Sequence, residues 1–74
     1  GQMAEELKGT TKKVYEAMQK LGMKSEEKAK GLEDIVREAR LPKGAVANGI
    51  TELTQKKLAK RRAGDKTAKY FLLR

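Results

Sequence analysis

Residues 32–53 read LEDIVREARLPKGAVANGITEL, and they decide the fold because two apolar stripes flank a single proline. Apolar residues three and four positions apart fall on one face of a helix. The first stripe is Leu32, Ile35, Val36 and Ala39, and the second is Val46, Ile50 and Leu53. Pro42 disfavours helical geometry in the residue before it and suits the first turn of a new helix. The stretch predicts a helix over 32–39, a tight turn, and a helix from Pro42 or Lys43 to Lys56.

An earlier stripe with the same spacing predicts another helix ahead of this stretch. Its members are Ala4, Leu7, Thr11, Val14, Met18 and Leu21. We expect this helix either to run from about Thr10 to Leu21 or to reach back to Met3. Thr10 or Thr11 is expected to be its N-cap. Gly22 suits its end, because glycine adopts the left-handed conformation at little cost.

The remaining segments are a linker and a hairpin. Residues 23–31 are polar and mixed in charge, which predicts a linker with at most one helical turn, capped by Ser25. After Leu58 the pattern changes to that of a β-hairpin, with Gly64-Asp65 as its turn signal. The first strand contains the basic residues Lys60, Arg61 and Arg62, and the second contains Tyr70, Phe71, Leu72 and Leu73.

This order of elements predicts an α+β fold that is mainly α, and it resembles the winged helix-turn-helix superfamily of DNA-binding domains. The apolar positions that carry the resemblance are Ile35, Ala39, Leu41, Val46, Ile50 and Leu53. The resemblance implies one three-helix domain over 10–74, with the helix-turn-helix at 32–56 and a C-terminal β-hairpin wing at 58–73. Residues 1–9 are expected to begin with a terminal scar, because two residues precede Met3, and they include the helix extension if the first helix reaches back to Met3.

Two positions depart from the pattern of that family. Arg40 stands in the turn between two helices and Lys57 stands before the wing, where the family often has glycine. A residue with a Cβ enters a tight, left-handed turn only at a cost in backbone energy. We therefore expect both residues to be held in tight conformations while the overall fold is unchanged.

The composition excludes several classes of protein. The chain has 74 residues with no Cys and no His, so neither a disulfide framework nor a structural zinc site is expected. The common general base and the strongest nucleophile are missing, so we expect neither an enzyme nor a cofactor. No apolar run approaches the roughly 20 residues that span a bilayer, and no signal-peptide pattern is present. We expect a soluble, cytoplasmic protein without a membrane partner. Because its core is small, stabilisation by formation of a homodimer stays an alternative.

The positive charge is confined to the second half of the chain. Residues 1–39 contain eight basic and eight acidic side chains, whereas residues 40–74 contain ten basic and two acidic ones. The second half therefore carries the whole net charge of +8. A solvated face is the ordinary explanation of a run of charges, but this asymmetry favours contact with a polyanion.

The resemblance implies that the helix after Pro42 enters the major groove of double-stranded DNA, while the wing contacts phosphates or the minor groove. The implied contact residues are Lys43, Ala45, Ala47, Asn48, Thr51, Gln55 and Lys56 on the helix, and Arg61, Arg62, Lys66 and Lys69 on the wing. Asn48 is suited to a bidentate pair with adenine, as is Gln55. No Arg lies between Lys43 and Gln55, which predicts modest sequence specificity and affinity that depends mainly on phosphate contacts.

Two alternatives stay open at this stage. The expected function is that of a transcriptional regulator or chromatin-associated factor, but the same fold also serves as a protein-protein interaction module without DNA binding.

Gly44 and Gly49 lie within the predicted third helix and weaken it. Either they allow a close approach by another group, or they are simply poor helix positions.

Overall fold

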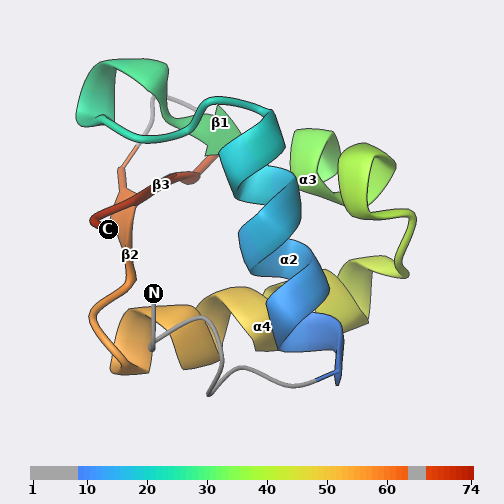
Figure 1. Ribbon diagram of the computed structural model, residues 1–74. Coiled ribbons are helices and arrows are strands. Elements are labelled where there is room, and N and C mark those ends of the chain that lie inside the picture. The colour runs from blue at the N-terminus through green and yellow to red at the C-terminus, as the bar shows by residue number, and fades with distance from the viewer. Residues whose placement is uncertain (1–8, 64–66) are drawn as a thin grey trace.

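The computed structural model describes residues 9–63 and 67–74, in which three α-helices accompany a small antiparallel sheet (Figure 1). The elements are α2 (Gly9–Lys20), η1 (Glu26–Lys28, a 3-10 turn), β1 (Lys30–Gly31), α3 (Leu32–Ala39), α4 (Lys43–Gln55), β2 (Ala59–Arg62) and β3 (Lys69–Leu72). This is the mainly helical α+β arrangement, like that of a winged helix, which the sequence predicts. The extension of the first helix to Met3 and the Gly64-Asp65 turn lie outside the described residues.

The three strands form one sheet in the order β1-β3-β2. β2 and β3 pair as the predicted hairpin, with Ala59 opposite Leu72 and Arg61 opposite Tyr70. The prediction of a plain linker over 23–31 is wrong at its end, where β1 pairs with β3. A two-residue strand of Lys and Gly has no apolar alternation that a sequence pattern can detect.

The predicted N-cap of the first helix is wrong, although the helical segments themselves are confirmed. Ser25 stands at the N-cap of η1 as predicted, but its side chain makes no capping hydrogen bond. α2 begins at Gly9, so Thr10 and Thr11 lie inside the helix. Gly22 follows α2 in the left-handed conformation that was expected of it, with φ +74°.

Both turn residues that replace glycine adopt the left-handed conformation, as predicted. Arg40 follows α3 with φ 56° and ψ 43°, and its N–H donates to the carbonyl of Val36 at 2.9 Å. Lys57 follows α4 with φ 61°, and its N–H donates to the carbonyl of Thr54 at 3.0 Å. This conformation costs a residue with a Cβ roughly 1 kcal/mol. The turns before and after α4 therefore each hold a basic residue in a strained backbone.

The core lies between the three helices and the inner face of the sheet. Its most deeply buried side chains are Val14, Met18, Met23, Ile35, Val46, Leu53 and Leu58. α2 crosses α4 (Figure 1), and a Cβ on Gly49 would lie 2.8 Å from Cγ2 of Val14. A Cβ on Gly44 would meet no atom within 4 Å. Gly49 is thus the glycine that allows a close approach, and Gly44 is simply a weak helix position.

Candidate nucleic-acid interface

α4 has a buried face and two flanks with different neighbours, because successive residues are about 100° apart around a helix. The buried face consists of Val46, Gly49, Ile50 and Leu53. The flank toward α2 contains Glu52, whose Oε2 accepts a 2.7 Å hydrogen bond from Oγ1 of Thr11. Ala45 and Lys56 share this flank by helical spacing. The single acidic side chain of α4 is therefore held on the side of the helix that faces α2.

The side chains on the face of α4 opposite the core are uncharged. Its exposed residues at helical spacing are Gly44, Asn48, Thr51 and Gln55. These four residues form an exposed ridge, and Ala47 and Thr54 lie beside it on the flank toward the sheet. After Lys43, which begins the helix, neither the ridge nor this flank contains a charged residue. Short, neutral side chains allow a partner to approach the helix closely along this ridge.

A groove of about 300 Å³ lies between this face of α4 and the strands β2 and β3. Its lining residues are Ala47, Ile50, Thr51, Thr54, Gln55, Arg61 and Tyr70. Three of the predicted contact residues of the helix therefore border the same hollow as one arginine of the wing. This juxtaposition is the central feature of the candidate site.

Strand alternation determines which wing residues reach this groove. Arg61 is paired with Tyr70, and side chains directly opposite in an antiparallel pair lie on one face of the sheet. Arg62 is paired with Lys69, so these two project from the other face. There Nη1 of Arg62 donates to the carbonyl of Glu26 at 3.3 Å, and its Nε lies 3.7 Å from the Glu26 carboxylate. Arg62 is therefore engaged with η1 and turned away from α4.

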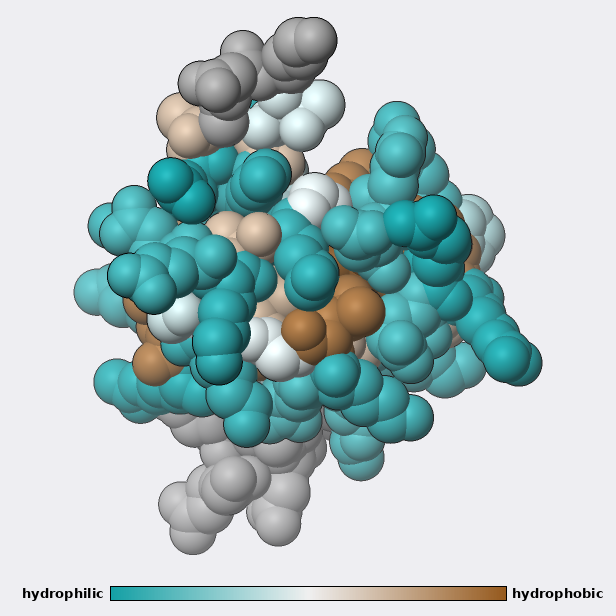
Figure 2. All heavy atoms as spheres, turned by 90° about the horizontal axis from the view of Figure 1, so that it is seen from above, coloured by the Kyte–Doolittle hydropathy of each residue, from teal (hydrophilic) through white to brown (hydrophobic). Residues whose placement is uncertain are grey.

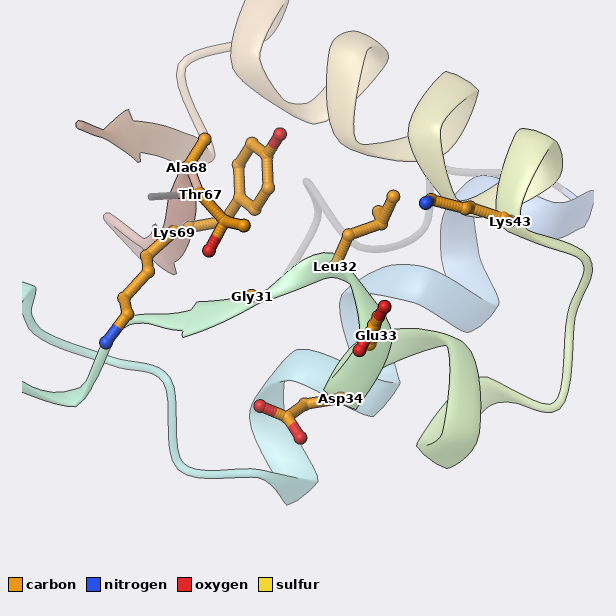
Figure 3. A pocket seen from close by; sticks show the side chains of 9 residues that line it. Gly31, Leu32, Glu33, Asp34, Lys43, Thr67, Ala68 and Lys69 are labelled. Atoms are coloured by element: carbon orange, nitrogen blue, oxygen red, sulfur yellow. The ribbon is translucent and has the colours of Figure 1, made fainter. Parts of the chain in front are cut away.

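A second hollow of about 470 Å³ lies near the start of α4 (Figure 3). Lys43 extends from α4 toward Leu32 across this hollow, whereas Lys69 extends away from it, past β1 (Figure 3). Glu33 and Asp34 of α3 also line the hollow. The Glu33 carboxylate opposes the charge of Lys43, and the Asp34 carboxylate pairs with Arg37, so this hollow is a poor site for an anion. The groove beside Arg61 is the better match to a phosphate-bearing partner.

The opposite side of the molecule has a different character. Figure 2 shows the face away from α4, where hydrophilic side chains surround a small apolar area. In residues 9–63 and 67–74, Leu73 is the one large hydrophobic side chain that is mainly exposed, at 50%. A small, isolated apolar exposure of this kind is ordinary on a protein surface.

The structure divides the predicted contact residues into two sets. Those at or beside the groove are Ala47, Asn48, Thr51, Gln55 and Arg61, whereas Lys43 at the start of α4 lines the second hollow. Those not brought to it are Ala45 and Lys56, on the flank toward α2, and Arg62 and Lys69, on the other face of the sheet. Lys66 lies outside the described residues.

Sequence reasoning missed three residues of the groove, of which Ile50 was assigned to the buried face of the helix. Thr54 lies three residues after Thr51, so helical spacing already places it beside that residue. Tyr70 enters the groove because it stands opposite Arg61, and this register is not visible in the sequence.

Other kinds of site are not found in the described part of the chain. It contains no group of three or more His, Cys, Asp or Glu that could hold a metal ion. None of its helices has both the length and the apolar character needed to cross a membrane. In comparisons with protein-family models, curated proteins and solved structures, the chain has no significant match. We therefore infer the function from the geometry and charge of the molecule.

Proposed function

We propose that this protein binds double-stranded DNA through α4 and the β2–β3 wing, as a transcriptional regulator or chromatin-associated factor in the cytoplasm of a prokaryote. One observation carries the proposal: Arg61 lines the same groove as Ala47, Thr51 and Gln55 of α4. A helix with a cation beside it matches a duplex, in which a groove of base edges lies next to a row of phosphates.

The dimensions of α4 suit the major groove. Its 13 residues give a helix of about 20 Å, and a helix of roughly 10–12 Å diameter fits a groove about 12 Å wide. The exposed ridge contains no charged side chain that would have to be desolvated. Asn48 on this ridge supplies the amide that pairs with adenine. Arg61 contacts a phosphate next to the base that Asn48 reads.

The charge distribution supports the same proposal. Glu52 is held toward α2 by Thr11, so no acidic side chain lines the groove beside Arg61. The second half of the chain has an excess of eight positive charges. Because few side chains on α4 can read base edges, phosphate contacts supply most of the affinity, and sequence preference is modest.

Titration of the protein with a duplex at several salt concentrations tests this function. We expect binding at low salt, with the logarithm of the affinity falling linearly with the logarithm of the salt concentration. Light scattering on the complex distinguishes one copy from a homodimer. If no duplex binds at low salt, or if binding has no salt dependence, the proposal fails and a protein-interaction module becomes the better account.

A further inference from the structure

The groove between α4 and the wing is lined mainly by apolar groups. Ile50 forms its floor, since it is buried, and Ala47 places a methyl group on one wall. The ring of Tyr70 closes the groove on the side of the sheet, and the Tyr70 hydroxyl, Gln55 and Arg61 supply polar groups. Such a surface favours a small apolar group with charge nearby.

The two threonines of the groove strengthen this apolar character. Oγ1 of Thr51 donates to the carbonyl of Ala47 at 3.0 Å, and Oγ1 of Thr54 donates to the carbonyl of Ile50 at 2.8 Å. Each hydroxyl proton is therefore used within α4. What these side chains offer a partner is a methyl group and an acceptor oxygen, with no hydrogen-bond donor.

A base edge that matches this surface must present an apolar group. In the major groove, adenine, cytosine and guanine present hydrogen-bonding groups, and thymine adds a C5-methyl group that pairs with Ala and Thr methyls. We propose that this groove selects the 5-methyl group of thymine, so that the protein prefers duplexes in which thymine methyls line the major groove. The inference rests on the proposed DNA binding and specifies what α4 reads there.

Charge complementarity makes a nucleic-acid duplex, rather than a purely apolar partner, the fitting occupant. Arg61 stands at the rim, where it can contact a phosphate next to the base whose methyl enters the groove. The groove offers no acidic side chain to repel that phosphate. A purely apolar partner would leave Arg61 unpaired beside it.

A comparison of thymine and uracil duplexes tests the inference. The probes are alternating A·T duplexes of equal length, one with thymine and one with deoxyuridine at every T position, so that only the methyl groups differ. We expect the wild-type protein to bind the thymine duplex about four-fold more tightly for each methyl group seated. A duplex in which 5-methylcytosine replaces cytosine is expected to gain affinity in the same way.

A variant separates the groove from any general effect of the methyl groups on the duplex. Thr51→Ser keeps the hydroxyl that donates to Ala47 and removes the side-chain methyl, so we expect a folded protein with a reduced preference for thymine. Thr10→Ser is the matched control, because Thr10 is exposed on α2 and does not line the groove. It is expected to retain the full preference.

The outcomes are distinguishable. Salt-dependent binding that is equal for the thymine and uracil duplexes overturns the inference and leaves the proposed function intact. A thymine preference that Thr51→Ser does not reduce also overturns it, since the methyl is then read elsewhere. Absence of binding to every duplex overturns both the proposed function and the inference.

Discussion

Thr11 on α2 donates a 2.7 Å hydrogen bond to Glu52 on α4, and Glu52 is the only acidic side chain among the described residues from Arg40 onward. Thr11 is only 5% exposed, so the bond forms where water competes weakly. The contact joins the two helices and also keeps the carboxylate on the flank away from the wing. Packing and surface charge are thus coupled through one pair of side chains.

Replacing Thr11 with valine removes this hydrogen bond while nearly preserving side-chain volume. We expect the free energy of unfolding to fall by about 1–2 kcal/mol, because the carboxylate of Glu52 loses a donor that water replaces only in part. For a domain of this size, each kcal/mol of lost stability lowers Tm by roughly 4–8 °C. Thr11→Ser retains the hydroxyl, so its free energy of unfolding is expected to fall by less than that of Thr11→Val. Equal stability of Thr11→Val and the wild type in thermal unfolding would contradict this account.

The two glycines of α4 are expected to respond oppositely to alanine. Gly44→Ala should raise the free energy of unfolding by up to about 1 kcal/mol, because alanine favours the helix and its Cβ meets open space. Gly49→Ala should lower it, because the new Cβ would lie 2.8 Å from a buried methyl group of Val14. Urea unfolding of both variants measures the difference. Stabilisation by Gly49→Ala would show that α2 and α4 are not packed this closely.

Glycine at the two strained turns is expected to stabilise the fold. Arg40→Gly and Lys57→Gly each relieve a left-handed backbone, and the greater freedom of glycine in the unfolded chain offsets part of the gain. We expect each to raise the free energy of unfolding by about 0.5–1 kcal/mol, and the two effects to add. Arg40→Ala and Lys57→Ala remove the same charges but keep a Cβ, so they should not raise the free energy of unfolding. Equal results for glycine and alanine would mean that backbone strain is not released at these turns.

Much of the fold was predictable because its signals are local. Pro42 and the apolar spacing around it locate α3, α4 and the turn between them. Arg40 and Lys57 were expected in tight turns, and both have positive φ. β1 was not predictable, because a two-residue strand depends on pairing with β3, and that register is a long-range property.

The candidate site was predictable only in part, because it too depends on contacts between segments that are far apart in the sequence. Helical spacing indicates that Ala45, Ala47 and Lys56 lie off the buried face, but not which flank meets the wing. Alternation along β2 indicates that Arg61 and Arg62 point to opposite faces, but not which one faces α4. The packing of the sheet against the helix decides both questions, and it brings Arg61 and Ala47 to one groove.

Two variants, Arg61→Gln and Arg62→Gln, test the claim that α4 and one face of the wing make a single surface for duplex DNA. The variants are adjacent and remove the same charge, but Arg61 lines the groove and Arg62 contacts Glu26 on the other face. Measured by duplex titration across salt concentrations, Arg61→Gln is predicted to weaken binding and to reduce the salt slope by about one. Arg62→Gln is predicted to leave the slope nearly unchanged. An equal loss from both variants, or a larger loss from Arg62→Gln, would contradict the claim.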